Sequence, residues 1–140
     1  MEGLGVAASI VAVVELSAKI ASLCFEYSIA VKDAKTDITR LHTKAKELEE
    51  VAKGVQELID GPRGVQLSTS QKLEQAVLSC HTQIKAIKER LDPGRRRKTM
   101  SRFGLRALKW PFESKEVDKI VRDLENCNAT ISLALQVDQT

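Results

Sequence analysis

The chain has 140 residues, of which 43% are hydrophobic, 29% charged and 4% aromatic, and its formal net charge at pH 7 is +3. This length fits one domain with one core, and this composition excludes an intrinsically disordered chain. The three cysteines are odd in number and widely spaced, which argues against a disulfide framework and for a reducing, cytosolic setting. We therefore expect a single domain over residues 1–140.

The first predicted helix covers residues 3–27 and is strongly apolar. The chain begins Met1-Glu2 rather than with a basic segment, so this stretch does not fit a secretory signal peptide. A helix of a soluble bundle and a membrane-spanning helix remain as interpretations. One narrow polar stripe recurs along it at helical spacing: Glu15, Lys19, Ser22 and Glu26.

The next two predicted helices, residues 33–60 and 68–91, carry apolar seams in steps of three and four. The seam of the earlier helix is Ile38, Leu41, Ala45, Leu48, Ala52, Val55 and Ile59. The turn Gly61-Pro62-Arg63-Gly64 ends that helix. Ser68 and Gln71 fit a capping box that starts the later helix. Its seam is Leu73, Val77, Cys80, Ile84, Ile87 and Leu91.

A basic segment follows, with no acidic residue between Asp92 and Glu113. We expect a short helix over residues 102–108 within it. Lys and Arg side chains at a bilayer surface are attracted to anionic lipids by about 1 kcal/mol each, and Trp110 and Phe112 are residue types that settle at the interface. No recognition motif for nucleic acid accompanies the charges, so nucleic-acid binding is not expected. The predicted anionic-lipid patch is Arg95, Arg96, Arg97, Lys98, Arg102, Arg106 and Lys109.

The last predicted helix covers residues 112–137. Because the connections are definite turns, the helices are expected to pack antiparallel within one chain. The predicted fold is therefore all-α: a single bundle of four main helices plus a short helix before the last. The seam of the last helix is Val117, Ile120, Val121, Leu124, Cys127, Ile131, Ala134 and Leu135.

The sequence offers no chemistry of a catalytic or metal site. His42 and His81 are its two histidines, and no spacing around them resembles a set of metal ligands. A Gly-rich phosphate loop, a nucleophile elbow and a plausible triad are also absent from the sequence. We therefore expect no catalytic residue, no metal and no cofactor, and a protein that is not an enzyme.

The first helix has a nearly balanced energy of membrane insertion. Residues 3–25 would form a helix of about 34 Å, which is enough for a hydrocarbon core of about 30 Å. Its ten Leu, Ile, Val and Phe side chains contribute about −3 to −6 kcal/mol, whereas Glu15 and Lys19 oppose insertion by about 5 to 7 kcal/mol. An ion pair between these two charges would lower that cost. We expect conditional insertion in an oligomer, gated by the two charges and driven by Leu4, Val6, Ile10, Val11, Val13, Val14, Leu16, Ile20 and Leu23.

Two stretches resemble a known family. The opening GLGVAASIVAVVELSAKIASL resembles the first helix of fungal HeLo-like domains, the N-terminal domains of fungal NOD-like receptors and of amyloid-signalled cell-death proteins. The closing LKWPFESKEVDKIVRDLENCNATISLAL is similar to that family's Trp-Pro segment and last helix. The resemblance spans the whole chain. It implies a bundle similar in architecture to the four-helix domain of the mixed-lineage kinase-like pseudokinase.

The resemblance also implies a function. Domains of this family target membranes and form pores or permeabilise them, and so execute cell death. Their toxicity resides in the first helix, which corresponds here to Gly3 to Leu23. Expected partners are anionic membrane lipids, further copies of the chain on activation, and an upstream receptor or amyloid signal acting through a C-terminal region missing from this sequence. The domain would be cytoplasmic at rest and would move to the plasma membrane on activation. The alternative is a non-lytic interaction and oligomerisation module of a signalling receptor.

Overall fold

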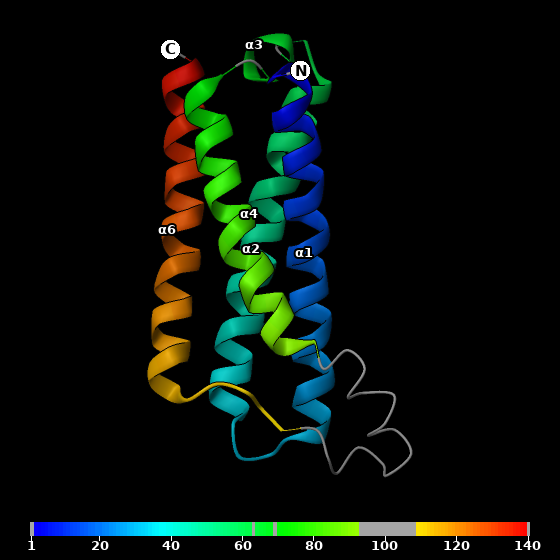
Figure 1. Cartoon of the computed structure of the whole chain (residues 1–140), viewed down its shortest axis with the longest axis vertical. Coiled ribbons are helices and arrows are strands. Elements are labelled where there is room, and N and C mark those ends of the chain that lie inside the picture. The colour runs from blue at the N-terminus through cyan, green and yellow to red at the C-terminus, as the bar shows by residue number, and fades with distance from the viewer. Residues whose placement is uncertain (1, 63, 69, 93–108, 140) are drawn as a thin grey trace.

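The computed structural model describes residues 2–62, 64–68, 70–92 and 109–139 (Figure 1). Over these residues the chain is all-α, with four long helices and one short helix and no strand, which confirms the predicted fold class. The helices are α1 (Glu2–Ala30), α2 (Lys35–Asp60), α3 (Gly64–Ser68), α4 (Gln71–Leu91) and α6 (Ser114–Gln139).

The long helices stand side by side as a bundle (Figure 1). Helices α1 and α4 run away from the end where both chain termini lie, and α2 and α6 return towards it. Helix α1 packs mainly on α2 and α4, and α6 packs on the same two helices from the other side. Helix α1 is therefore a corner of the bundle. We call the end formed by Ala30, Lys35, Leu91 and Ser114 the distal end.

The apolar seams form the core, as predicted. All the seam residues of α2 are buried except Ile59, which is half-buried, and the whole seam of α4 is buried. In α6, Ile120 and Leu135 are half-buried and the other seam residues are buried. The three cysteines are free and buried, and burial raises the pKa of Cys24 to about 12. They pack as small apolar side chains, as expected.

The start of α4 differs from the prediction. Ser70, not Ser68, caps this helix, because Ser70 has an extended backbone and its Oγ accepts a hydrogen bond from the Leu73 amide at 3.2 Å. Ser68 is instead the last residue of α3, which the sequence analysis did not predict. The predicted short helix at 102–108 lies outside the described residues.

The last helix begins two residues later than predicted, at Ser114. Glu113 precedes it, and the Glu113 carbonyl accepts the first helical hydrogen bond from the Val117 amide at 3.0 Å. The Glu113 amide donates to the Glu116 carboxylate at 3.2 Å, which satisfies an amide that the helix itself leaves without a partner. Helices α2 and α6 are also joined by ion pairs, Arg40 to Asp118 at 2.7 Å and Lys44 to Glu125 at 3.5 Å.

Candidate functional site

Helix α1 is the candidate functional element. Within the described residues it is the one helix that is long and apolar enough to cross a membrane, over Val6–Ala30. A buried core helix passes the same test of length and composition, and α1 packs one side into the core of this bundle. Of the predicted insertion residues, five are buried in the bundle: Val6, Ile10, Val13, Ile20 and Leu23.

The other predicted insertion residues lie in different environments. Val14 and Leu16 are half-buried against the core. Val11 is exposed, and the side chain of Leu4 is outside the described ones. In the bundle, one side of α1, amounting to 39% of its apolar stretch, is buried against neighbouring helices, chiefly α2 and α4. Membrane insertion of α1 therefore requires that it leave the bundle.

The two predicted gating charges are exposed and unpaired. Among the described residues, neither Glu15 nor Lys19 makes an ion pair or a side-chain hydrogen bond, so the predicted ion pair between them is not formed. Water competes with the ion pair for both charges, and an exposed ion pair at this helical spacing adds only about 0.3–0.5 kcal/mol to stability. The resting fold leaves both charges hydrated.

The outer side of α1 is less polar than its predicted stripe. Phe25 and Ile29 are each 61% exposed. These two residues were not predicted as exposed, although helical spacing indicates it: Phe25 follows Ser22 by three residues and Ile29 follows Glu26 by three. The stripe therefore ends in two large apolar side chains near the distal end.

A groove separates α1 from α4 on this side of the bundle. Its volume is about 570 Å³. Both gating charges lie on its rim, and α4 adds charged groups across from them. One of these, Lys88, is engaged by Asp92 at 3.4 Å. The groove is lined by Ala12, Glu15, Leu16 and Lys19 of α1 and by His81, Lys85, Lys88 and Glu89 of α4.

The predicted interface aromatics pack inside the distal end. Trp110 contacts Tyr27 edge-on with ring centres 5.3 Å apart, and contacts Phe112 at 5.4 Å. Phe112 is buried, and the Arg90 guanidinium lies 4.4 Å from its ring centre. Trp110 is half-buried, so the fold withdraws Phe112 fully and Trp110 partly from water, and ring packing on Tyr27 stabilises this arrangement. Among the described residues at this end, Phe25 is an exposed aromatic side chain.

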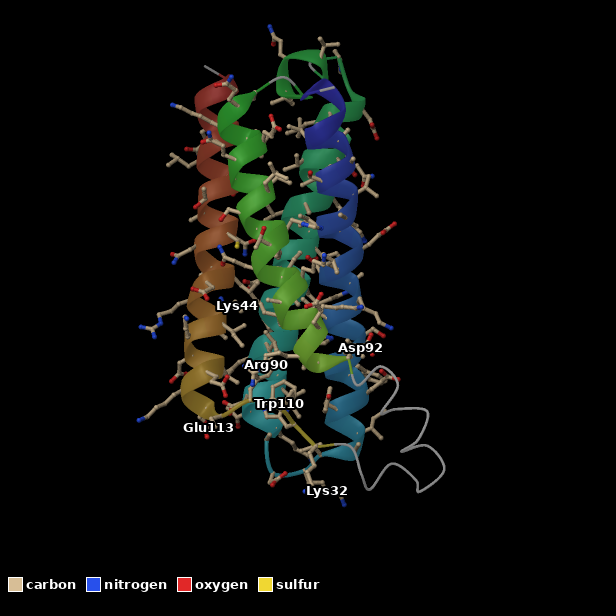
Figure 2. The ribbon with its side chains drawn as sticks, in the orientation of Figure 1. Lys32, Lys44, Arg90, Asp92, Trp110 and Glu113 are labelled. Carbon is tan, nitrogen blue, oxygen red and sulfur yellow. The ribbon has the colours of Figure 1, made fainter. Side chains whose placement is uncertain are left out.

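Polar contacts hold the same cluster in place. The Tyr27 hydroxyl donates to the Leu91 carbonyl at 2.7 Å, which ties the end of α1 to the end of α4. Arg90 donates to the Pro111 carbonyl at 2.9 Å and to the Glu116 carboxylate. The hydrogen bond from Arg90 holds the pKa of Glu116 below its usual range. Figure 2 shows Arg90, Trp110 and Glu113 close together at the distal end.

Most of the predicted anionic-lipid patch lies outside the described residues: Arg95, Arg96, Arg97, Lys98, Arg102 and Arg106. Lys109 is described and exposed. It lines a cavity of about 640 Å³ together with Lys32, Asp33 and Asp37. The basic segment joins Asp92 to Lys109, and both of these residues lie at the distal end (Figure 2). In the part of the chain that the structure describes, no three His, Cys, Asp or Glu side chains form a possible metal site.

The comparisons with known proteins identify the family. A family model described as "Pigment biosynthesis cluster protein PigL N-terminal" matches residues 1–138. The comparisons with curated proteins and with solved structures gave no match. The family match does not address the predicted HeLo-like relation. Because it spans nearly the whole chain, the chain belongs to the family of pigment biosynthesis cluster protein PigL N-terminal domains.

Proposed function

We propose that this domain is a HeLo-like, membrane-targeting bundle in which α1 leaves the bundle on activation and permeabilises a membrane as part of an oligomer. One observation carries the proposal: a helix of spanning length and apolarity occupies a corner of the bundle. The family description names a pigment biosynthesis cluster and no chemical step, so the proposal rests on this helix.

In this proposal the same apolar side chains of α1 contact the bundle core before release and lipid after it. Val13, Ile20 and Leu23 are buried against neighbouring helices at rest and would face lipid after release. A single released helix has an insertion energy near zero, because Glu15 and Lys19 cost about 5–7 kcal/mol in hydrocarbon. In an oligomer these charges can turn towards one another or towards water. Insertion then depends on assembly.

The distal end supplies the contact with the membrane surface. Lys32, Lys109 and the six basic residues of the segment between Asp92 and Lys109 would attract anionic lipids by about 1 kcal/mol each at close approach. We propose that the resting domain is cytoplasmic and that an upstream receptor or amyloid signal sends it to the plasma membrane. There it would act as an executor of cell death.

Dye leakage from anionic vesicles tests this proposal. Val11 is already exposed, so Val11→Glu should fold normally, but it adds about 2–3 kcal/mol to the insertion of α1. Leu133→Glu is the matched control, because Leu133 is an exposed aliphatic residue of α6. We expect leakage from the wild type and from Leu133→Glu and a strong loss in Val11→Glu. No leakage from the wild type, or equal leakage from both variants, would refute the proposal.

A second candidate function is a non-lytic interaction and oligomerisation module. The exposed side chains of Phe25 and Ile29 favour it, because large apolar groups of this kind mark interaction surfaces when they cluster. This function would give stable association in solution with no affinity for vesicles. Vesicle co-sedimentation at several lipid charges separates the two candidates.

A further inference from the structure

One face of the bundle has apolar ends and a charged middle. It consists of the outer side of α1 and the adjoining side of α4, and we call it the α1/α4 face. Four of the seven large hydrophobic side chains exposed within the described residues belong to it. Its exposed or rim residues are Val11, Glu15, Lys19, Phe25 and Ile29 of α1 with Leu78, Lys85 and Glu89 of α4.

The apolar residues lie at the two ends of this face. Val11 is 39% exposed and lies in the first half of α1, the half nearer to the N-terminus. Leu78 is 43% exposed and precedes the groove residue Lys85 by seven positions, so the helix period puts it on the same side of α4. Phe25 and Ile29 lie towards the distal end. The groove, with its charged rim, separates these two apolar ends.

This pattern is complementary to itself. In α1, Val11 and Phe25 are equally far from residue 18, and Glu15 and Lys19 are equally far from residue 17. A single two-fold axis crossing α1 between residues 17 and 18 lies within one residue of both midpoints, so it would set Val11 of one copy near Phe25 of the other. It would also set Glu15 opposite Lys19 in both directions. A symmetric dimer requires this reciprocity, in which residue i contacts j and j contacts i.

We propose that the α1/α4 face binds a second copy of the same chain, with the two α1 helices antiparallel, to form a symmetric dimer in solution. This inference deepens the second candidate function by naming the surface and the partner, and it is independent of the membrane function because it needs no lipid. From Val11 to Ile29 the face is about 27 Å long, and it is about 20 Å wide over two helices, or roughly 540 Å² per copy. That is about two thirds of the roughly 800 Å² per partner that stable interfaces bury.

The charges favour a second copy over a lipid surface. Within the face, Glu15 and Glu89 balance Lys19 and Lys85, and Lys88 is held by Asp92. A balanced middle is not attracted to anionic headgroups, and its charges would be costly in hydrocarbon. A second copy instead offers each unpaired charge of α1 an opposite partner.

Charge reversal in the absence of lipid tests the dimer. Glu15→Lys sets two lysine side chains opposite each other at both symmetric contacts, and Lys19→Glu sets two glutamate side chains opposite each other. Each variant should raise the dimer dissociation constant by about tenfold in sedimentation equilibrium. A mixture of the two variants should recover dimers of near wild-type affinity, because both contacts of the heterodimer again join a lysine to a glutamate.

Exposed apolar residues supply the matched pair of controls. Phe25→Ser should weaken the dimer, and Leu133→Ser on α6 should leave it unchanged, with folding of both checked by circular dichroism. A monomeric wild type, or a mixture of charge variants that does not regain affinity, would overturn the proposal. If the wild type is monomeric in solution and Phe25 becomes buried on vesicles, the face binds lipid, and the dimer proposal is overturned in that case too. Sedimentation without lipid does not depend on vesicle leakage, so the membrane proposal stands or falls separately.

Discussion

Removing the Tyr27 hydroxyl tests how firmly α1 is held in the bundle. This hydroxyl is buried and donates to the Leu91 carbonyl at 2.7 Å, at the end of α4. Tyr27→Phe keeps the ring that packs on Trp110 but removes this donor. A typical hydrogen bond contributes about 1 kcal/mol, and a buried carbonyl left unsatisfied costs about 1–3 kcal/mol. We expect the free energy of unfolding to fall by about 1–2 kcal/mol.

The same substitution should ease the release of α1. A loss of about 1–2 kcal/mol changes a folded-to-open ratio by about 5- to 30-fold, so leakage of anionic vesicles should begin at lower protein concentration. Urea unfolding and dye leakage are measured on the same preparations. Ser22→Ala is the control, because Ser22 is an exposed residue of α1 whose replacement should change stability by less than about 0.5 kcal/mol.

Two results would refute this reasoning at different steps. If Tyr27→Phe unfolds at the wild-type urea concentration, the hydrogen bond to Leu91 does not hold α1. If Tyr27→Phe is destabilised as expected but leaks vesicles no more readily than the wild type, packing of α1 does not restrain membrane activity.

Three further predictions concern polar groups of the bundle. Ser17 is fully buried and its Oγ has no hydrogen-bond partner among the described residues, so Ser17→Ala should leave the melting temperature unchanged or raise it. Ser70→Ala removes the cap of α4 and should lower the free energy of unfolding by about 1 kcal/mol in urea titrations. Burial alone would raise the pKa of Glu49, but hydrogen bonds and charge from Lys53 and Lys46 outweigh it and lower this pKa. The ionised Glu49 carboxylate therefore stabilises the fold above the pKa of unfolded Glu, about 4.3, and this stabilisation is lost as pH falls through the lower folded pKa. The free energy of unfolding in urea should be higher for the wild type than for Glu49→Gln at pH 7, and the difference should shrink below about pH 4.3.

The sequence predicted the long helices and most of the core, because aliphatic residues at steps of three and four specify which side of a helix is buried. It did not predict the fate of Trp110 and Phe112. Next to a basic segment these rings resemble interface anchors, but their burial depends on contact with Tyr27, which is far away in the sequence. The predicted cap of α4 was wrong for a local reason, since Ser68 and Ser70 both suit a cap and only backbone geometry selects Ser70.

The outer side of α1 was the least predictable part of the candidate site. Apolar residues occur around most of this helix, so its sequence does not show which of them face water. The bundle decides this: Leu23 is buried and Phe25 is exposed, two positions apart. The Glu15–Lys19 spacing permits an ion pair, but hydration of both groups at an exposed position competes with it. Tertiary packing and solvent, rather than local pattern, determined these features.

The most direct test of the central claim is to measure where α1 lies when anionic vesicles leak. The native cysteines are buried, so a polarity-sensitive thiol probe can be placed selectively at Phe25→Cys on α1 or, as a control, at Leu133→Cys on α6; both positions are exposed, and neither belongs to the polar stripe of α1. Our account predicts that quenchers attached to lipid acyl chains reach the probe at position 25 and not the probe at position 133. Leakage with both probes remaining in water would contradict it.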